Sequence, residues 1–143
     1  MKTLLLGLML LANGAFAATA LRTTSVTLIG PHGEREVIKA EVADTPKLRE
    51  VGLMNRKQLG ADEGMVFVWP QAEKVGFWMK DTLISLDIIF ARGGQVVAVA
   101  PDAKPMDETV ISPPDAIDLV LEVNGGWAAR HKMGAGWRVA VGQ

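Results

Sequence analysis

The sequence predicts a mainly β fold, a compact single-domain β-sandwich or barrel-like structure with two short helices. Two observations support this prediction. Most apolar runs are short and end at Gly, Pro or Asn. Short runs bounded by such turn residues are typical of strands rather than of long helices. The chain also has no internal repeat, low-complexity segment or linker that would divide it into separate domains.

Eight short segments carry the strand pattern, with turn signals between them. Pro31 and Gly33 lie in the first turn, and Gly93 and Gly94 form the turn of the clearest hairpin. Pro70 is expected to end the third strand because proline lacks the N–H that a strand ladder needs. The expected strands are residues 25–29, 34–42, 64–69, 75–79, 86–91, 95–100, 117–123 and 137–141.

Two stretches carry helix signals instead. Thr45 is a suitable N-cap, Pro46 suits the first turn, and Gly52 should end this helix. A second short helix is expected over residues 126–133, between two glycine-containing turns. The proline-rich segment 101–114 is predicted to be a long loop.

The first 17 residues have the pattern of a secretory signal peptide. Lys2 supplies a positive start, an apolar run follows over residues 4–12, and Ala15-Phe16-Ala17 offers a small-x-small cleavage site. Because the run is about half of the ~20 residues that a spanning helix needs, we expect cleavage after Ala17 and no transmembrane segment in the mature chain. The protein is therefore predicted to be periplasmic or secreted, with residues 18–24 as a flexible lead-in and 25–143 as one domain.

Composition excludes several classes of function. The chain has no Cys, so disulfides, thiolate catalysis and Cys-based zinc or iron–sulfur sites are excluded. Without Lys2 it has 14 basic and 16 acidic residues and no sizeable basic cluster, so nucleic acid is not an expected partner. The 126 residues after the leader suffice for one real core.

An ordered set of unusual motifs lies between residues 52 and 126. They are Gly52-Leu53-Met54 with Arg56, Glu63-Gly64-Met65 with Phe67, Phe77-Trp78-Met79-Lys80 with Thr82, Leu86-Asp87-Ile88 with Phe90, and Leu121-Glu122-Val123 followed by Gly126. This set resembles the family known as domain of unknown function 192, over about residues 41–141. The resemblance implies a small, mostly β bacterial domain, often exported, and it implies no activity, cofactor or partner.

The chain departs from the pattern of that family in two places. Many relatives have a Cys after Pro where this chain has Pro105-Met106, and many have a Tyr where it has Ile117-Asp118-Leu119. Any family role of that thiol or phenol therefore does not carry over.

Asp87 and Glu122 are the candidate catalytic residues, because each lies within an apolar strand. Burial raises the pKa of a carboxyl group unless a cation or donor opposes it, and two such groups in one cleft could act as acid and base. The alternative is that each carboxyl group is held structurally by Arg56, by Lys80 or by backbone N–H groups.

A ligand site is the second candidate. Trp78 and Lys80 would point to the same face of a strand, and a cation beside an aromatic wall could hold an anionic or sugar-like ligand. Simple packing of Lys80 on Trp78 at a sheet edge is the alternative. The candidate ligand-binding residues are Arg56, Trp78, Lys80, Thr82 and Asp87.

No metal or cofactor is expected. Met thioethers can select Cu(I), but the Met residues of the mature chain lack the spacing of a metal motif and more often fill gaps in a core. His32 and His131 lie far apart in the sequence, and Ser85 and Ser112 lack a nucleophile-elbow context.

Two functions are compatible with these features. The first is a non-catalytic binding or accessory protein of the cell envelope, with a small-molecule or envelope ligand. The second is an enzyme acting on an envelope saccharide or a similar polar substrate, with Asp87 and Glu122 as the acid and base groups. Convergence of the two carboxyl groups with Arg56 or Lys80 in one open pocket would favour the enzyme, and separate pairing would favour the binding protein.

Overall fold

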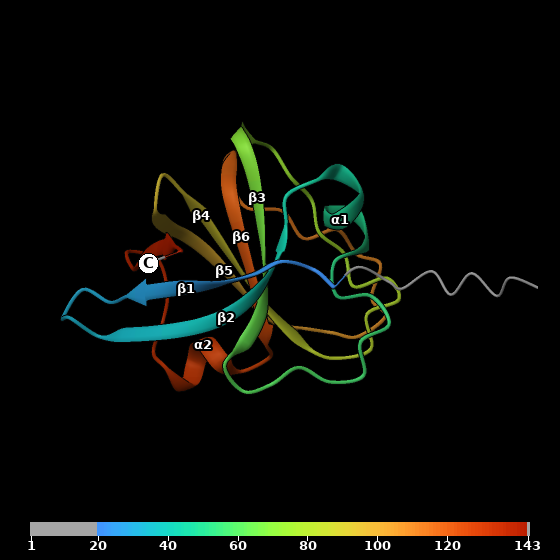
Figure 1. Cartoon of the computed structure of the whole chain (residues 1–143), viewed down its shortest axis with the longest axis horizontal. Helices are drawn as coiled ribbons and strands as arrows, with labels where there is room; N and C mark the ends of the chain where they lie inside the picture. Colours follow the sequence, from blue (N-terminus) through green and yellow to red (C-terminus); the bar gives the residue numbers. More distant parts are fainter. Residues whose placement is uncertain (1–19, 143) are drawn as a thin grey trace, which may run out of the picture.

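Residues 20–142 are described by a computed structural model, and within them seven strands form one mixed sheet that closes into a ring (Figure 1). The mainly β class with two short helices is therefore confirmed, whereas the predicted leader, residues 1–17, lies outside the described residues. The strands are β1 (Thr23–Ile29), β2 (Arg35–Ala43), β3 (Glu63–Glu73), β4 (Leu86–Arg92), β5 (Gln95–Ala103), β6 (Ile117–Asn124) and β7 (Arg138–Val141), and the helices are α1 (Pro46–Val51) and α2 (Trp127–Arg130).

The strands follow the order β1-β2-β3-β6-β4-β5-β7 around the ring. All neighbours are antiparallel except β2 and β3, which run parallel because α1 and the loop after it carry the chain back to the same end. β7 pairs with β1 over four residues and with β5 through Gln95 and Arg138, and these pairings close the ring.

Two hydrophobic cores lie on the two faces of this sheet. All seven strands send alternate side chains into the inner core, and Trp127 and Ala128 of α2 pack on it. The outer core lies on the outside of β3, β6 and β4, where α1 and the loops of the chain gather (Figure 1). Its buried residues are Ala43, Leu53, Met65, Phe67, Met79, Leu86, Ile88, Phe90, Ala103, Ile117 and Val120.

Helix α1 forms where the sequence predicts it. The hydroxyl group of Thr45 accepts a hydrogen bond from the Leu48 N–H at 3.2 Å, and Pro46 occupies the first turn. Gly52 ends the helix with φ 49° and donates its N–H to the Leu48 carbonyl at 2.9 Å. A side chain at Gly52 would be strained by this φ and would press on the Phe67 ring at 3.3 Å, so glycine lets α1 lie close against β3.

Several predicted boundaries are wrong. β3 continues through Pro70 to Glu73, because the β3–β6 register shifts between Val68 and Glu73 and the exposed proline need not donate there. Residues 75–79 do not form a strand, and they meet the loop before β6 only through a bridge between Phe77 and Ile111.

Smaller differences affect the other elements. β1 begins at Thr23, inside the segment that the sequence predicts to be a lead-in. β5 extends to Ala103 and takes the first residues of the predicted loop. The second helix spans only Trp127–Arg130 instead of residues 126–133. Within residues 20–142, no helix has the length and apolar character required to cross a membrane.

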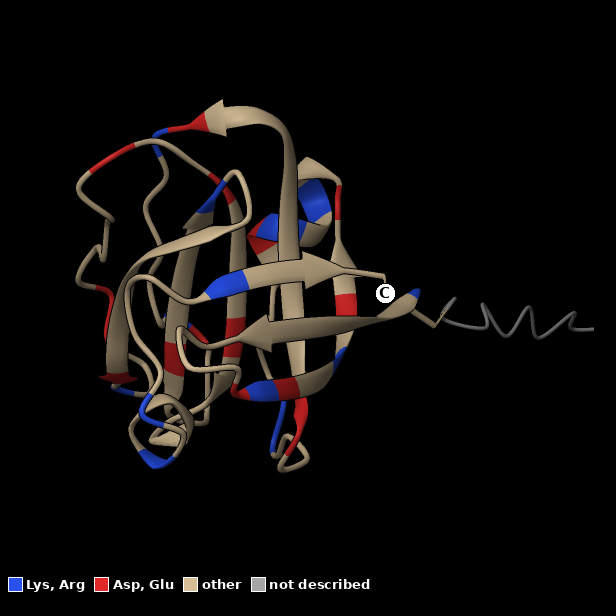
Figure 2. Cartoon of the chain, turned by 90° about the vertical axis from the view of Figure 1, so that its left-hand side faces the viewer, with Lys and Arg blue, Asp and Glu red and all other residues tan. Residues whose placement is uncertain are grey.

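Basic and acidic residues are distributed along many of the strands and loops (Figure 2). In the view of Figure 2, blue and red segments are interspersed along the strands and loops, and no large area carries a single sign. This distribution matches the nearly balanced composition of the chain.

Candidate functional site

The two candidate catalytic carboxyl groups lie on opposite faces of the sheet. On the β4–β6 pair, Asp87 is opposite Val123, and Ile88 is opposite Glu122. Val123 belongs to the inner core and Ile88 to the outer core, and successive side chains of a strand alternate between faces. Asp87 therefore points into the ring and Glu122 points out of it, so the two groups do not form an acid/base pair.

Asp87 is completely buried, and backbone N–H groups surround its carboxyl group. Oδ1 accepts from Asp102 N at 2.9 Å and from Gly126 N at 3.0 Å, and Oδ2 accepts from Ala128 N at 2.8 Å. Three donors satisfy a buried acceptor well and tie the turn before α2 and the end of β5 to β4. This arrangement is a structural anchor and leaves the group closed to a substrate.

Glu122 is buried to a similar degree, with 5% of its surface exposed. No hydrogen bond or ion pair to its carboxyl group occurs among residues 20–142, and the one cause of its shifted pKa is burial, which raises the pKa to about 8. The group is therefore mostly protonated at neutral pH. It forms part of the lining of a pocket on the outer face of the sheet.

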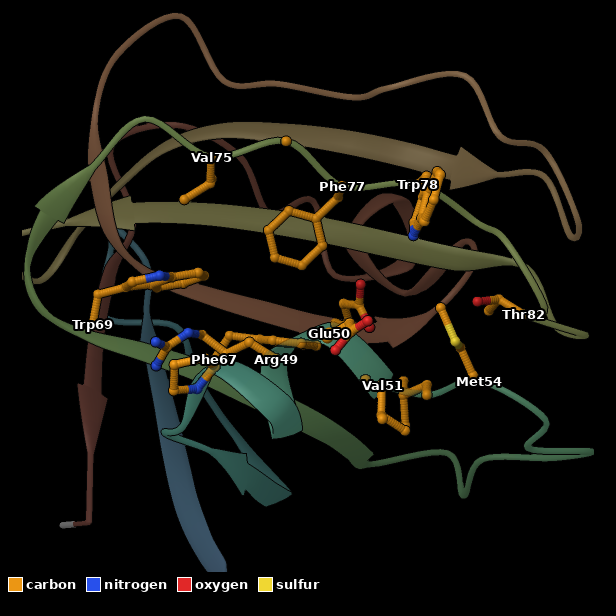
Figure 3. A pocket seen from close by; sticks show the side chains of 15 residues that line it. Arg49, Glu50, Val51, Met54, Phe67, Trp69, Val75, Phe77, Trp78 and Thr82 are labelled. Atoms are coloured by element: carbon orange, nitrogen blue, oxygen red, sulfur yellow. The ribbon is translucent and has the colours of Figure 1, made fainter.

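This pocket has a volume of about 350 Å³ and lies between α1, β3 and the segment 75–82. Figure 3 shows Phe77 and Trp78 along one side, Trp69 with Arg49 at one end, and Met54 and Thr82 at the other. The lining residues are Pro46, Arg49, Glu50, Val51, Gly52, Leu53, Met54, Phe67, Trp69, Val75, Gly76, Phe77, Trp78, Thr82 and Glu122.

Gly64 helps to position Glu122 at the pocket. A Cβ atom at this position of β3 would collide with the carbonyl oxygen of Glu122 on β6. Glycine therefore allows the close approach of the two strands, and Met65, directly opposite Glu122 in the register, shares its face.

The charged residues of α1 that line the pocket are engaged elsewhere. Arg49 donates from Nη1 to the Val68 carbonyl at 2.9 Å, and its guanidinium carbon lies 5.1 Å from the centroid of the Trp69 ring. Glu50 accepts from Lys47 at 3.3 Å in an exposed ion pair. Neither contact satisfies the carboxyl group of Glu122.

The predicted ligand-binding residues separate into two groups. Trp78 and Thr82 line the pocket together with Glu122. Lys80 lies outside the lining, with Nζ 5.1 Å from the centroid of the Trp78 ring, and its carbonyl accepts from the Thr82 hydroxyl at 3.1 Å. Asp87, as described above, faces the inner core.

Arg56 belongs to a different part of the surface. Both of its terminal nitrogens donate to the carboxylate of Glu41, with Nη1 to Oε1 at 3.3 Å. The pair borders a second, polar cavity of about 140 Å³ that Lys39 and Glu63 also line. Arg56, Lys80 and Asp87 therefore hold neither one another nor a shared ligand site.

Sequence reasoning missed several lining residues. Phe67 and Trp69 are two residues apart on one strand, so they lie on one face and could have indicated a pocket wall. Arg49 carries no such signal, because a basic residue on a short helix is usually exposed. Among residues 20–142, no group of three or more His, Cys, Asp or Glu side chains could hold a metal ion.

Comparison with known proteins places the fold in a family. The model of DUF192, described as an uncharacterised ACR, matches residues 27–141, which confirms the resemblance read from the motifs. A protein of unknown function from Novosphingobium aromaticivorans is 38% identical, with a TM-score of 0.82 over 87% of this chain and 89% of the other. A protein from Sinorhizobium meliloti described as a candidate transcription regulator is 32% identical, with a TM-score of 0.83 over 85% of this chain and 95% of the other. No curated protein matches the sequence.

Proposed function

We propose that this chain, which belongs to the DUF192 family, is a non-catalytic binding protein of the cell envelope whose pocket over Glu122 holds a small molecule or a side chain of a partner. One observation carries the proposal: a buried carboxyl group without any partner in the described chain opens onto an aromatic pocket. The leader pattern of residues 1–17 supports the envelope location.

The unpaired carboxyl group of Glu122 supports a binding role. It accepts no hydrogen bond from residues 20–142, whereas Asp87 shows that this fold can satisfy a carboxyl group completely. Such unsatisfied groups in native proteins call for an explanation. A ligand whose polar group reaches Glu122 would supply the missing partner.

The shape and lining of the pocket support the same role. Its volume of about 350 Å³ suits a small organic molecule, and its walls are apolar and aromatic with few polar groups. Trp78 is 44% exposed at the pocket, although large aromatic residues are usually more deeply buried. Contact with a ligand would cover this apolar surface.

The arrangement of titratable groups favours binding over hydrolysis of a saccharide. Acid/base hydrolysis needs two carboxyl groups flanking one bond, but Asp87 faces the other side of the sheet. Glu50, the other carboxylate of the lining, is paired with Lys47. Glu122 therefore acts in the proposal as a recognition group.

A neutral aromatic probe tests the pocket directly. We expect 2-phenylethanol to shift the NMR signals of the Trp69 and Trp78 indole N–H groups and of Thr82, because all three residues line the pocket. Trp78→Ala should weaken this binding by about three- to tenfold through the loss of apolar contact. Leu83→Ala is the matched control, since Leu83 is also 44% exposed but does not line the pocket.

Two NMR results would contradict the proposal. Signals of the pocket residues that stay unshifted up to the solubility limit of the probe would contradict it. Equal shifts around the whole ring, unchanged in Trp78→Ala, would also contradict it, because they would indicate nonspecific association.

A further inference from the structure

We infer that the ligand class of the Glu122 pocket is an organic ammonium: a primary or secondary amine, protonated, that carries an apolar or aromatic substituent. The inference rests on the proposed function and names its ligand. It follows from three features of the pocket, which are the unpartnered carboxyl group, the aromatic lining and the engagement of the pocket's cation elsewhere.

The carboxyl group of Glu122 lacks both a charge partner and a hydrogen-bond donor among residues 20–142. An ammonium group supplies both, with two or three N–H donors around a positive charge. A neutral hydroxyl group would supply one hydrogen bond, and a carboxylate would add a second negative group. Charge-assisted hydrogen bonds are about twice as strong as neutral ones, so the ammonium best compensates the burial of Glu122.

Aromatic rings are the second feature. Four of them line the same pocket, and ring faces attract cations through their quadrupole. Two of the rings already contact cations of the protein. Arg49 lies 5.1 Å from the centroid of the Trp69 ring, and Lys80 lies 5.1 Å from the centroid of the Trp78 ring. The four rings are Phe67, Trp69, Phe77 and Trp78.

Arg49 is the one basic residue of the described lining, and it could instead favour an anion. Its Nη1 already donates to the Val68 carbonyl, and its guanidinium stacks near Trp69 at one end of the pocket. Glu50 and Glu122 are the two acidic residues of the lining. With Glu122 ionised, the lining carries one positive and two negative groups and favours a cationic ligand.

Binding of an ammonium must displace a proton. Burial holds the free Glu122 mostly protonated at pH 7, because its pKa is about 8. When the ammonium docks, the carboxyl group ionises, its proton passes to the buffer, and the ligand nitrogen keeps all of its hydrogens. A neutral ligand leaves this proton in place. The number of released protons therefore reports whether the carboxyl group has acquired a cationic partner.

Isothermal titration calorimetry with three matched probes tests the inference: phenethylamine, 2-phenylethanol and phenylacetate. We expect the amine to bind at least about tenfold more tightly than the alcohol. Titrations at pH 7 in phosphate and in HEPES, which differ in ionisation enthalpy, should show release of close to one proton for the amine and none for the alcohol. In Glu122→Gln the affinity advantage should fall below about threefold and the proton release should vanish.

The outcomes separate this inference from the proposed function. If the alcohol or phenylacetate binds the pocket as tightly as the amine, the ammonium inference fails and the binding function stands. If none of the probes perturbs the pocket, both fail. The affinity order of the three probes on the wild-type protein decides the question even if Glu122→Gln is poorly folded, because it needs no variant.

Discussion

Asp87 and Glu122 form an internal comparison, since they lie on neighbouring strands and are both almost completely buried. Three backbone N–H groups reach Asp87 on the inner face, and no group within residues 20–142 reaches Glu122 on the outer face. The same side-chain chemistry at nearly the same depth therefore has two outcomes. The two residues differ in their hydrogen-bond donors and not in their burial, and this difference makes Asp87 a structural anchor and Glu122 a candidate site residue.

The largest expected effect concerns the anchor. Asp87→Asn replaces an oxygen acceptor by an NH2 group that faces an N–H donor, so at least one hydrogen bond is lost and the rest weaken. Hydrogen bonds to charged groups contribute about 1.5–3 kcal/mol each, so we expect a loss of roughly 4–6 kcal/mol. The melting temperature, measured by circular dichroism, should fall by roughly 10–20 °C.

Asp118→Asn is the matched control for that variant. Both oxygens of Asp118 accept from Gly93 N at 3.2 Å, but the residue is only partly buried. Its replacement should cost about 1 kcal/mol or less. Equal melting temperatures of Asp87→Asn and the wild type would show that Asp87 is not an anchor.

The second effect is a pH dependence that arises from Glu122. Its folded-state pKa of about 8 lies above the ordinary 4.5, so the folded protein holds a proton that the unfolded chain releases between these values. The free energy of unfolding should be highest below pH 4.5 for this group, and it should fall as the pH rises to 8. Each unit of pKa corresponds to about 1.4 kcal/mol, so the total fall between pH 4.5 and pH 8 is roughly 5 kcal/mol.

Glu122→Gln isolates this contribution. Urea denaturation from pH 5 to pH 9 should give a flatter profile than the wild type, with the variant more stable at pH 9 because glutamine cannot ionise. A variant whose stability declines as steeply as that of the wild type would assign the pH dependence to other groups.

The smallest effect concerns the Arg56–Glu41 pair, which contrasts with both buried carboxyl groups. Its side chains are 37% and 30% exposed, so water screens the interaction. A double-mutant cycle of Arg56→Met and Glu41→Gln should give a coupling of about 0.5–1 kcal/mol that shrinks at 1 M salt. A coupling above about 2 kcal/mol, insensitive to salt, would make this pair a third structural anchor.

Local signals were sufficient for the elements that depend on short-range chemistry. Thr45, Pro46 and Gly52 predict α1 because a cap, a fixed φ and a positive φ act within one turn. Gly93 and Gly94, both at positive φ, predict the hairpin between β4 and β5. Residues 75–79 have the alternation of a strand, but Val75, Phe77 and Met79 pack toward the outer core without a neighbouring strand.

The candidate site depended on information that the local sequence lacks. Glu122 could be singled out as a carboxyl group in an apolar strand, and Trp78 and Thr82 as members of a mixed aromatic and polar motif. Which face Glu122 occupies follows from the register of β6 against β3 and β4, which is a long-range property. The donors of Asp87 are backbone N–H groups at the end of β5 and at the start of α2. Every residue except proline has such a group, so the sequence does not show which of them reach Asp87.

The anchor at Asp87 has a consequence for the choice among alternative folds. Sliding β4 by one residue along β6 would turn Asp87 away from its three donors and toward the apolar outer core. Every such misaligned pairing would bury a carboxyl group without compensation, at a cost of several kcal/mol. Asp87 therefore favours the native register of β4 against β6 twice, since its hydrogen bonds stabilise this register and its burial without partners would destabilise the shifted one.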